Sequence, residues 1–369
     1  MKRAGKLSLP KLHMPKMQLP QAHWPRLRRL GGRIGAIALL VVVWLVLVLY
    51  IALFILAKGP SPTASNLFVC SVQETSAVGF LARLFFSQEQ IDRITGANVQ
   101  AEYQEMDTSL IVMPPQEAAD REQEKKADAW GLVDEDGDGI ILETVNGESY
   151  TGYMMVVLDP SRVILGSVPG SYGGRGYTVA EMAKRFDAVA AINAGGFDDP
   201  GGKGNGSVPE TMVAFKGKIY ESYLGCGGGF AGFDDKHILH VGKFSAADLR
   251  ERNIQYGCGF GPVLIVNGEA VDPSLLRSGL NPRTAIGQRA DGAVLLLVID
   301  GRQVTSLGAS YHDLVDILLS YGAVNACNMD GGSSSLMWHN GDYVNTCASV
   351  LGIRPVPTAF LVLKEGQHE

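Results

Sequence analysis

Apolar residues fill one stretch near the start of the chain without interruption. Residues 34–57, IGAIALLVVVWLVLVLYIALFILA, contain no charged side chain. As a helix they would extend about 36 Å, which exceeds the roughly 30 Å hydrocarbon core of a bilayer. A buried core helix would show a polar stripe, and the apolar region of a cleaved signal peptide is usually shorter, about 7–15 residues. The pattern predicts a single transmembrane helix, with an unusually long signal sequence as the alternative.

Charge is divided unevenly around this stretch. Residues 1–33 carry nine basic side chains and no acid, so the net charge of −6 divides into +9 there and −15 in the remainder. Prolines at every fifth position from Pro10 to Pro25 oppose a helix in this arm. Because basic flanks stay on the cytoplasmic side, we predict a cytoplasmic arm at residues 1–33 and export of the chain after residue 57. The acidic exported part argues against a nucleic-acid partner.

Between the span and residue 130 the pattern is helical and carries no catalytic motif. A predicted linker, GPSPTAS at residues 59–65, precedes two predicted helices, at 79–94 and 114–129. The second of these is highly charged, as expected for a solvated helix. We interpret residues 58–130 as a juxtamembrane linker or helical stalk, and residues 131–369 as the globular domain.

Short strands and tight turns dominate after residue 140. Turn signals bound predicted strands at 150–158 and 188–192, and a capping box from Thr178 to Glu181 begins a helix between them. Hairpin turns are predicted at the glycine-containing pairs 216–217, 267–268 and 340–341.

A strand, a helix and a second strand are predicted between residues 293 and 329. Residues 293–299 form an apolar run that suits a buried strand, Ser310 caps a helix that ends before Gly322, and residues 323–329 form the second strand. Such a crossover makes the two strands parallel, so their carboxyl ends share one edge of the sheet. The expected fold is an α+β domain with a mixed β-sheet, flanking helices and a βαβ crossover, preceded by one transmembrane helix.

Polar residues follow both strands of this crossover. Asp300 ends the first strand and Asp330 the second, at the edge where ligands usually bind. The glycines after Asp330, in DGGSSS at 330–335, would let backbone amides approach an oxyanion, and the serine hydroxyls offer donors to a phosphate or a sugar. The alternative is a simple turn, because Asp-Gly is common in hairpins.

Two arginines flank the first of these strands. Arg283 precedes it and Arg302 follows its end. A guanidinium matches phosphate oxygens bidentately, although a single arginine is more often a surface salt-bridge partner. The Asp-Gly turn at 291–292 predicts a hairpin that pairs 283–288 with 293–299 and sets Arg283 near Asp300. On that geometry both guanidiniums can face one phosphate.

Other motifs point to no cofactor and no catalytic metal. The run DEDGDG at 134–139 resembles the opening of a calcium loop, but an EF-hand needs a glutamate where Val145 stands, so a solvated turn is the favoured interpretation. The glycine-rich stretch 193–207 matches no nucleotide-binding fingerprint. Export permits disulfides, although five cysteines leave at least one thiol unpaired within the chain.

Taken in order, several motifs resemble one known family. INAGGF (192–197), GPVLIVNG (261–268), RTAIG (283–287), DGR (300–302) and NMDGGSSS (328–335) are together similar to the phosphodiester glycosidase domain, over roughly residues 140–363. This domain occurs in the lysosomal enzyme that uncovers mannose 6-phosphate and in bacterial proteins associated with exopolysaccharide. The chain departs from the usual form at Ser333, where a third glycine is common, and at Asp198, where an aromatic residue is frequent. Arg354 matches the arginine that often precedes the final strand.

The resemblance implies hydrolysis of the bond between the anomeric carbon of a sugar and a phosphate oxygen. Such a reaction needs carboxylates near a developing oxocarbenium ion and cations that hold the phosphate. We expect Asp300 and Asp330 to be the catalytic carboxylates. The expected substrate-binding residues are Asn193, Gly195, Gly196, Arg283, Thr284, Arg302, Gly331, Gly332, Ser333 and Ser334.

These observations predict a membrane-anchored extracytoplasmic hydrolase. Its substrate would be a sugar-phosphodiester glycan or glycolipid of the cell envelope or of an exopolysaccharide. The alternative is a non-catalytic glycan-binding or assembly factor for exopolysaccharide that keeps the fold without turnover. The presence of both aspartates and both arginines favours the enzyme.

Overall fold

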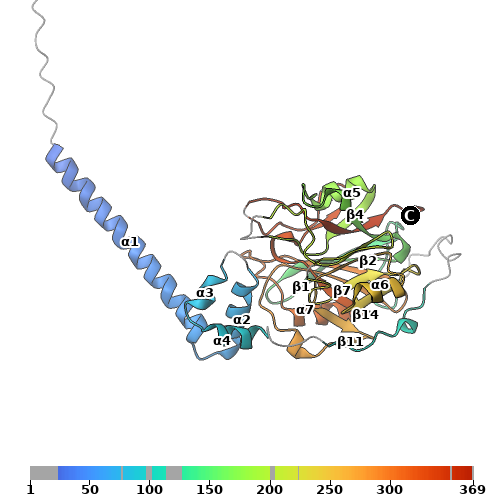
Figure 1. Ribbon diagram of the computed structural model, residues 1–369. Coiled ribbons are helices and arrows are strands. Elements are labelled where there is room, and N and C mark those ends of the chain that lie inside the picture. Colours follow the sequence, from blue (N-terminus) through green and yellow to red (C-terminus); the bar gives the residue numbers. More distant parts are fainter. Residues whose placement is uncertain are drawn as a thin grey trace, which may run out of the picture. The chain divides into compact units, whose positions relative to one another are not determined.

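The chain divides into two units, residues 1–55 and 56–369, in the computed structural model (Figure 1). The structure describes residues 24–75, 78–96, 102–113, 127–199, 204–222, 224–349 and 351–367. Most of the helix predicted at 114–129 lies outside the described residues. The predicted domain boundaries at residues 33, 57 and 130 stay predictions.

Helix α1 (Trp24–Lys58) contains the apolar stretch. It begins before the predicted start at residue 34, and Pro25 lies in its first turn, where the missing backbone N–H costs nothing. Its segment Arg33–Lys58 is long and apolar enough to cross a membrane, a criterion that a signal sequence near an N-terminus also meets. Large apolar side chains such as Trp44 are exposed along this segment.

Three short helices follow, and we call them the α2–α4 layer: α2 (Pro62–Gln73), α3 (Phe80–Arg83) and α4 (Gln88–Thr95). The single helix predicted at 79–94 is divided because Ser87 forms a capping box with Gln90 and starts a new helix. Val69, Ala82 and Ile91 form a small buried cluster that holds the three helices together.

A seven-stranded sheet supplies the elements around the predicted site. Its strands, in spatial order, are β1 (Ile140–Asn146), β2 (Thr151–Val157), β13 (Val294–Ile299), β12 (Arg283–Arg289), β14 (Ala323–Met329), β10 (Val263–Val266) and β11 (Glu269–Ala270). Each neighbouring pair is antiparallel.

Two five-stranded sheets complete the domain. One has the order β16 (Asp342–Tyr343), β15 (Met337–His339), β4 (Ala188–Asn193), β17 (Thr358–Leu363) and β3 (Val163–Ser167). The other has the order β6 (Lys218–Tyr220), β5 (Val213–Phe215), β9 (Tyr256–Gly259), β7 (Phe230–Phe233) and β8 (Leu239–Gly242). The remaining α-helices are α5 (Val179–Arg185), α6 (Ala246–Glu251) and α7 (Tyr311–Ser320).

The predicted crossover is present, with one strand inserted. Helix α7 connects β13 to β14, and Ser310 caps it as predicted. The two strands are parallel because both pair antiparallel with β12, which lies between them. The pairing of Arg283 with Ile299 confirms the predicted hairpin. The carboxyl ends of β13 and β14 therefore lie on one edge, flanking the start of β12.

The core explains why β13 is apolar at every position. Its alternate side chains pack into two different clusters, Leu296 with side chains of the other two sheets and Leu297 with α7. Leu314 and Leu318 of α7 belong to that second cluster. A strand buried on both faces needs no polar alternation.

The acidic run after residue 133 forms a turn that enters β1. Carboxylate oxygens of Asp134, Asp136 and Asp138 lie within 4.8 Å of one another. Asp134 accepts hydrogen bonds from the backbone of Gly137 and Gly139, each at 2.9 Å. These contacts suit the favoured interpretation as a turn.

Candidate active site

A cavity of about 500 Å³ opens at the carboxyl end of β14. Its walls come from the loop after β4, the residues before β12, the turn after β13, the start of α7 and the loop after β14. One further wall comes from the end of α2. The cavity thus lies where the crossover argument places a ligand site.

Most of the predicted site residues line this cavity. They are Gly196, Arg283, Arg302, Asp330, Gly331, Gly332, Ser333 and Ser334. The other four, Asp300, Asn193, Gly195 and Thr284, are buried around the cavity rather than on its wall.

Asp330 has the environment of a group that exchanges protons near neutral pH. Burial raises the pKa of its carboxyl to about 7, opposed by a hydrogen bond from Ser334 and the positive charge of Arg354, and reinforced by the negative charge of Glu210. Its backbone N–H donates to Ala194 at 2.8 Å. A carboxyl with a pKa near the working pH can act as a general acid or a general base.

Asn193 ties the strand ends behind Asp330 together. Its Nδ2 donates to the Asp330 carbonyl at 2.6 Å, and its Oδ1 accepts from Thr284 Oγ1 at 2.8 Å and from the Leu336 N–H at 3.1 Å. The side chain is fully buried. Because both the nitrogen and the oxygen of the side-chain amide are hydrogen-bonded, Asn193 is placed to position β4, β12 and β14 relative to one another.

Asp300 holds a neighbouring loop at the end of β13. Its Oδ1 accepts from Asn345 Nδ2 at 3.0 Å and from the Thr346 N–H at 3.2 Å. Burial raises the pKa of this carboxyl, and both hydrogen bonds oppose that rise. The sheet edge therefore carries both predicted aspartates, but Asp330 is the one on the cavity wall.

Glycine is required in the loop after β14. Gly332 has a φ of +62°, and its N–H donates to the Pro282 carbonyl at 2.9 Å. A Cβ at this position would lie 3.3 Å from Arg302 Nη2, so the guanidinium rests close against the loop. Only a residue without a side chain fits both conditions comfortably.

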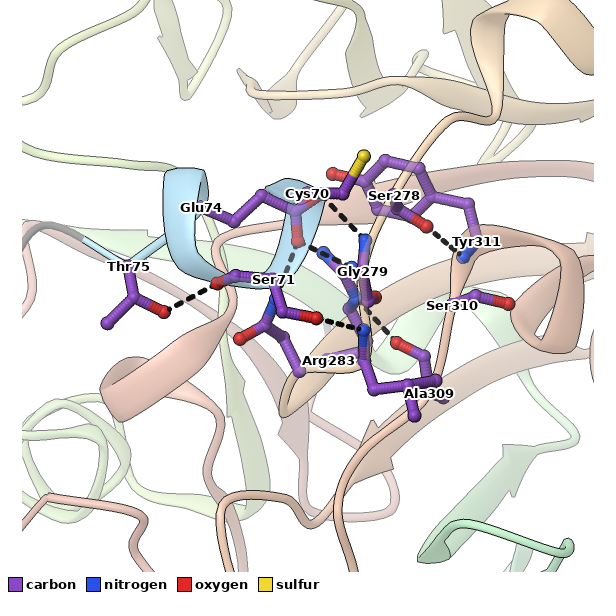
Figure 2. Close-up of polar contacts among 12 residues, drawn as sticks. Cys70, Ser71, Glu74, Thr75, Ser278, Gly279, Arg283, Ala309, Ser310 and Tyr311 are labelled. Atoms are coloured by element: carbon purple, nitrogen blue, oxygen red, sulfur yellow. Dashed lines mark hydrogen bonds and ion pairs between the residues drawn. The ribbon is translucent and has the colours of Figure 1, made fainter. Parts of the chain in front are cut away.

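Arg283 is extensively bonded within the protein (Figure 2). Its Nε donates to the Ala309 carbonyl at 3.0 Å, and its Nη2 donates to the Gly279 carbonyl at 2.7 Å and to Glu74 Oε2 at 2.8 Å. The guanidinium also lies 4.3 Å from the ring centre of Tyr311.

The other two cavity arginines have different partners. Arg302 Nη2 donates to Thr75 Oγ1 at 2.8 Å and to Asn281 Oδ1 at 3.1 Å, both uncharged oxygens. Arg354 pairs with Asp199 at 2.7 Å and donates to Ser333 Oγ at 3.3 Å. Both guanidiniums line the cavity that contains Asp330.

Several cavity residues were not among those predicted. Glu210 lines the wall, and burial together with Asp198 and Asp199 raises the pKa of its carboxyl. Glu74 and Thr75 come from the segment interpreted as a stalk. No local sequence signal marks these residues, because their partners are brought close only by folding. Arg354 also lines the cavity, and its match to the arginine that often precedes the final strand in the family was the one available sequence signal.

Comparison with known proteins agrees with the motifs. Residues 186–363 match the family model described as phosphodiester glycosidase. The chain is 33% identical over 180 residues to the SPbeta prophage-derived uncharacterized protein YomE of Bacillus subtilis (strain 168), covering 46% of this chain and 27% of that protein. It is 26% identical over 214 residues to N-acetylglucosamine-1-phosphodiester alpha-N-acetylglucosaminidase of Homo sapiens, covering 52% of this chain and 40% of that protein. The chain thus matches less than half of the length of each relative.

Two solved structures share the fold. The zebrafish N-acetylglucosamine-1-phosphodiester alpha-N-acetylglucosaminidase catalytic domain, auto-inhibited by its pro-peptide, superposes with a TM-score of 0.51 at 21% identity, covering 61% of this chain and 82% of that one. A hypothetical protein from Synechocystis superposes with a TM-score of 0.50 at 16% identity, covering 61% and 62%. At these identities the likeness concerns the fold.

Proposed function

We propose that this chain, whose residues 186–363 match the phosphodiester glycosidase family model, hydrolyses a sugar-1-phosphodiester outside the cytoplasm while anchored to the membrane. The observation that supports this most is Asp330, a carboxyl with a pKa of about 7 on the wall of a cavity that also holds three arginines. The substrate would be a sugar-phosphodiester glycan or glycolipid of the cell envelope or an exopolysaccharide.

The reaction assigns distinct tasks to the cavity residues. Water attacks the anomeric carbon, the bond from that carbon to the phosphate oxygen breaks, and its electron pair leaves with the phosphomonoester. The free sugar keeps the water oxygen. Asp330 would exchange the proton that this balance requires, as acid or base. The Arg302 guanidinium would bind the phosphate.

The second carboxylate of the proposed site is Glu210. It lines the cavity and adds to the negative potential that raises the pKa of Asp330. The sequence had suggested Asp300 for this task. The hydrogen bonds from Asn345 and Thr346 to Asp300 support a positioning role for that side chain instead. Glu210 is therefore the candidate for stabilising the developing oxocarbenium ion.

Membrane anchoring is supported by the apolar segment Arg33–Lys58 and the basic residues before it. By the positive-inside rule, these features support a domain that lies outside the cytoplasm.

The direct test is an assay of the purified full-length chain in detergent. Incubation with the methyl phosphodiester of N-acetylglucosamine 1-phosphate should release reducing sugar and methyl phosphate in equal amounts. If the chain binds exopolysaccharide but releases no reducing sugar from a panel of sugar-1-phosphodiesters, the non-catalytic assembly factor becomes the better description.

A further inference from the structure

The three arginines of the cavity are not equivalent in charge. Arg283 pairs with Glu74 at 2.8 Å, and Arg354 pairs with Asp199 at 2.7 Å. Arg302 donates to the uncharged oxygens of Thr75 and Asn281. Among the described residues, Arg302 has no carboxylate partner and keeps its charge available for a ligand, while the other two guanidiniums are each offset by a carboxylate. Burial and the positive charge of the neighbouring Arg283 lower the pKa of Arg302, and the negative charge of Glu74 opposes that shift.

Glu74 reaches the cavity from outside the family-matched region. It follows the last turn of α2, and its Oε2 accepts from Arg283 Nη2 at 2.8 Å and from Asn281 Nδ2 at 2.7 Å. Ser71, one turn earlier, accepts from the Leu280 N–H at 3.0 Å. Figure 2 shows both side chains directed from the helix toward Gly279 and Arg283.

The end of α2 packs tightly against the backbone at Gly279. A Cβ on Gly279 would lie 2.2 Å from the Ser71 backbone nitrogen, so the helix and the residue 279 backbone are in direct contact. The Arg283 side chain is 5% exposed and that of Glu74 is 26% exposed. A carboxylate in such a pair affects a ligand in the same cavity more strongly than a solvated surface charge does.

We propose that Glu74 is a specificity-determining residue, which offsets Arg283 so that the cavity prefers a singly charged phosphodiester to a doubly charged phosphomonoester. The inference rests on the proposed function and adds to it a reason why the phosphomonoester product would leave. A diester carries one negative charge at neutral pH, whereas a monoester carries close to two above its second pKa of about 6. One free guanidinium matches the diester, and a second would favour the monoester.

Thr75 completes this arrangement as a positioning residue. Its hydroxyl accepts from Arg302 Nη2, the same nitrogen that bonds to Asn281. The residues at the end of α2 therefore contact both Arg283, which is paired with a carboxylate, and Arg302, which is not. A carboxylate placed at residue 75 would offset Arg302 as well.

The test measures binding rather than turnover, so its result can be interpreted even if the chain hydrolyses no phosphodiester. Dissociation constants of methyl phosphate and dimethyl phosphate for the full-length chain are compared at pH 8 by ligand-observed NMR. The wild type should bind dimethyl phosphate at least as tightly as methyl phosphate. Glu74→Gln keeps the shape of the side chain and removes its charge. It should tighten methyl phosphate binding about tenfold, with about a threefold change or less for dimethyl phosphate.

Two variants accompany this measurement. Glu89→Gln is the matched control, because Glu89 also pairs with an arginine, Arg93 at 3.2 Å, but its side chain is 85% exposed on α4. It should leave both constants unchanged. Thr75→Asp adds a carboxylate beside Arg302 and leaves the Glu74–Arg283 pair in place. It should weaken the binding of both ligands, and that of methyl phosphate more.

The proposal is overturned if Glu74→Gln, folded by circular dichroism, gives the same ratio of the two constants as wild type and Glu89→Gln. If Glu74→Gln does not fold, Thr75→Asp decides, and an unchanged ratio in that variant overturns the proposal. An altered ratio in a chain that hydrolyses no phosphodiester would uphold the charge selection while contradicting the proposed enzymatic function.

Discussion

At the scale of single residues, Asp330 carries the strongest expectation. Asp330→Asn keeps the size of the side chain but cannot exchange a proton, so hydrolysis should fall by at least about a hundredfold. The rate of reducing-sugar release checks this, with a melting curve to show that the variant is folded. Asp342→Asn, at an exposed aspartate in β16, is the control and should keep wild-type activity. Near-normal turnover of Asp330→Asn would remove Asp330 from the mechanism.

The same carboxyl makes stability depend on pH. The pKa of Asp330 is about 7 in the folded chain against an ordinary value of 3.8, so the folded state holds a proton that the unfolded state releases. The stability that this proton contributes is complete below pH 3.8 and is lost as pH rises toward 7. Asp330→Asn should therefore be more stable than wild type at pH 8, by up to about 4 kcal/mol, and the difference should shrink toward pH 4. Equal differences at the two pH values would contradict the burial of this carboxyl.

At the scale of elements, the joint between β4, β12 and β14 depends on one amide. Asn193→Leu would leave the Asp330 carbonyl and the Thr284 hydroxyl without their partner, so unfolding free energy should drop by about 2–3 kcal/mol. Since Asn193 positions the end of β14, kcat should fall while KM changes little. Asn146→Ala, at an exposed position of β1, should change stability by less than about 0.5 kcal/mol. A large rise in KM at unchanged stability would instead support the predicted contact between Asn193 and the substrate.

At the scale of the whole molecule, the expectation concerns location. The basic residues before the apolar segment and the near-absence of basic residues directly after Lys58 predict that the domain faces outward. Protease added to intact cells should degrade the domain, and a C-terminal tag that is active only outside the cytoplasm should report. A cytoplasmic protein of known location serves as the control for cell integrity. Protection of the domain in intact cells, together with its digestion after lysis, would contradict this topology.

The sequence correctly predicted those elements whose start, end or burial is determined by neighbouring residues. The capping boxes at Thr178 and Ser310, the hairpin turns and the apolar run of β13 are each determined by neighbouring residues. The helix predicted at 79–94 failed at Ser87, where a second capping signal lies inside the predicted span. The crossover placed Asp330 on the correct edge, because the handedness and length of such a connection depend on the chain itself.

The sequence by itself thus determined the apolar segment, the family resemblance, the strand–helix–strand unit and the residues of the DGGSSS loop. Only the tertiary structure decided which polar residues meet in the cavity. Glu74 and Arg283 are 209 positions apart, and no periodicity links them. Asp300 and Asp330 both follow strands at one edge of the sheet. Asn345 and Thr346 donate hydrogen bonds to Asp300, however, whereas burial raises the pKa of Asp330 to about 7. Burial and charge pairing depend on contacts between distant segments, so they follow from the packed chain and not from any local pattern.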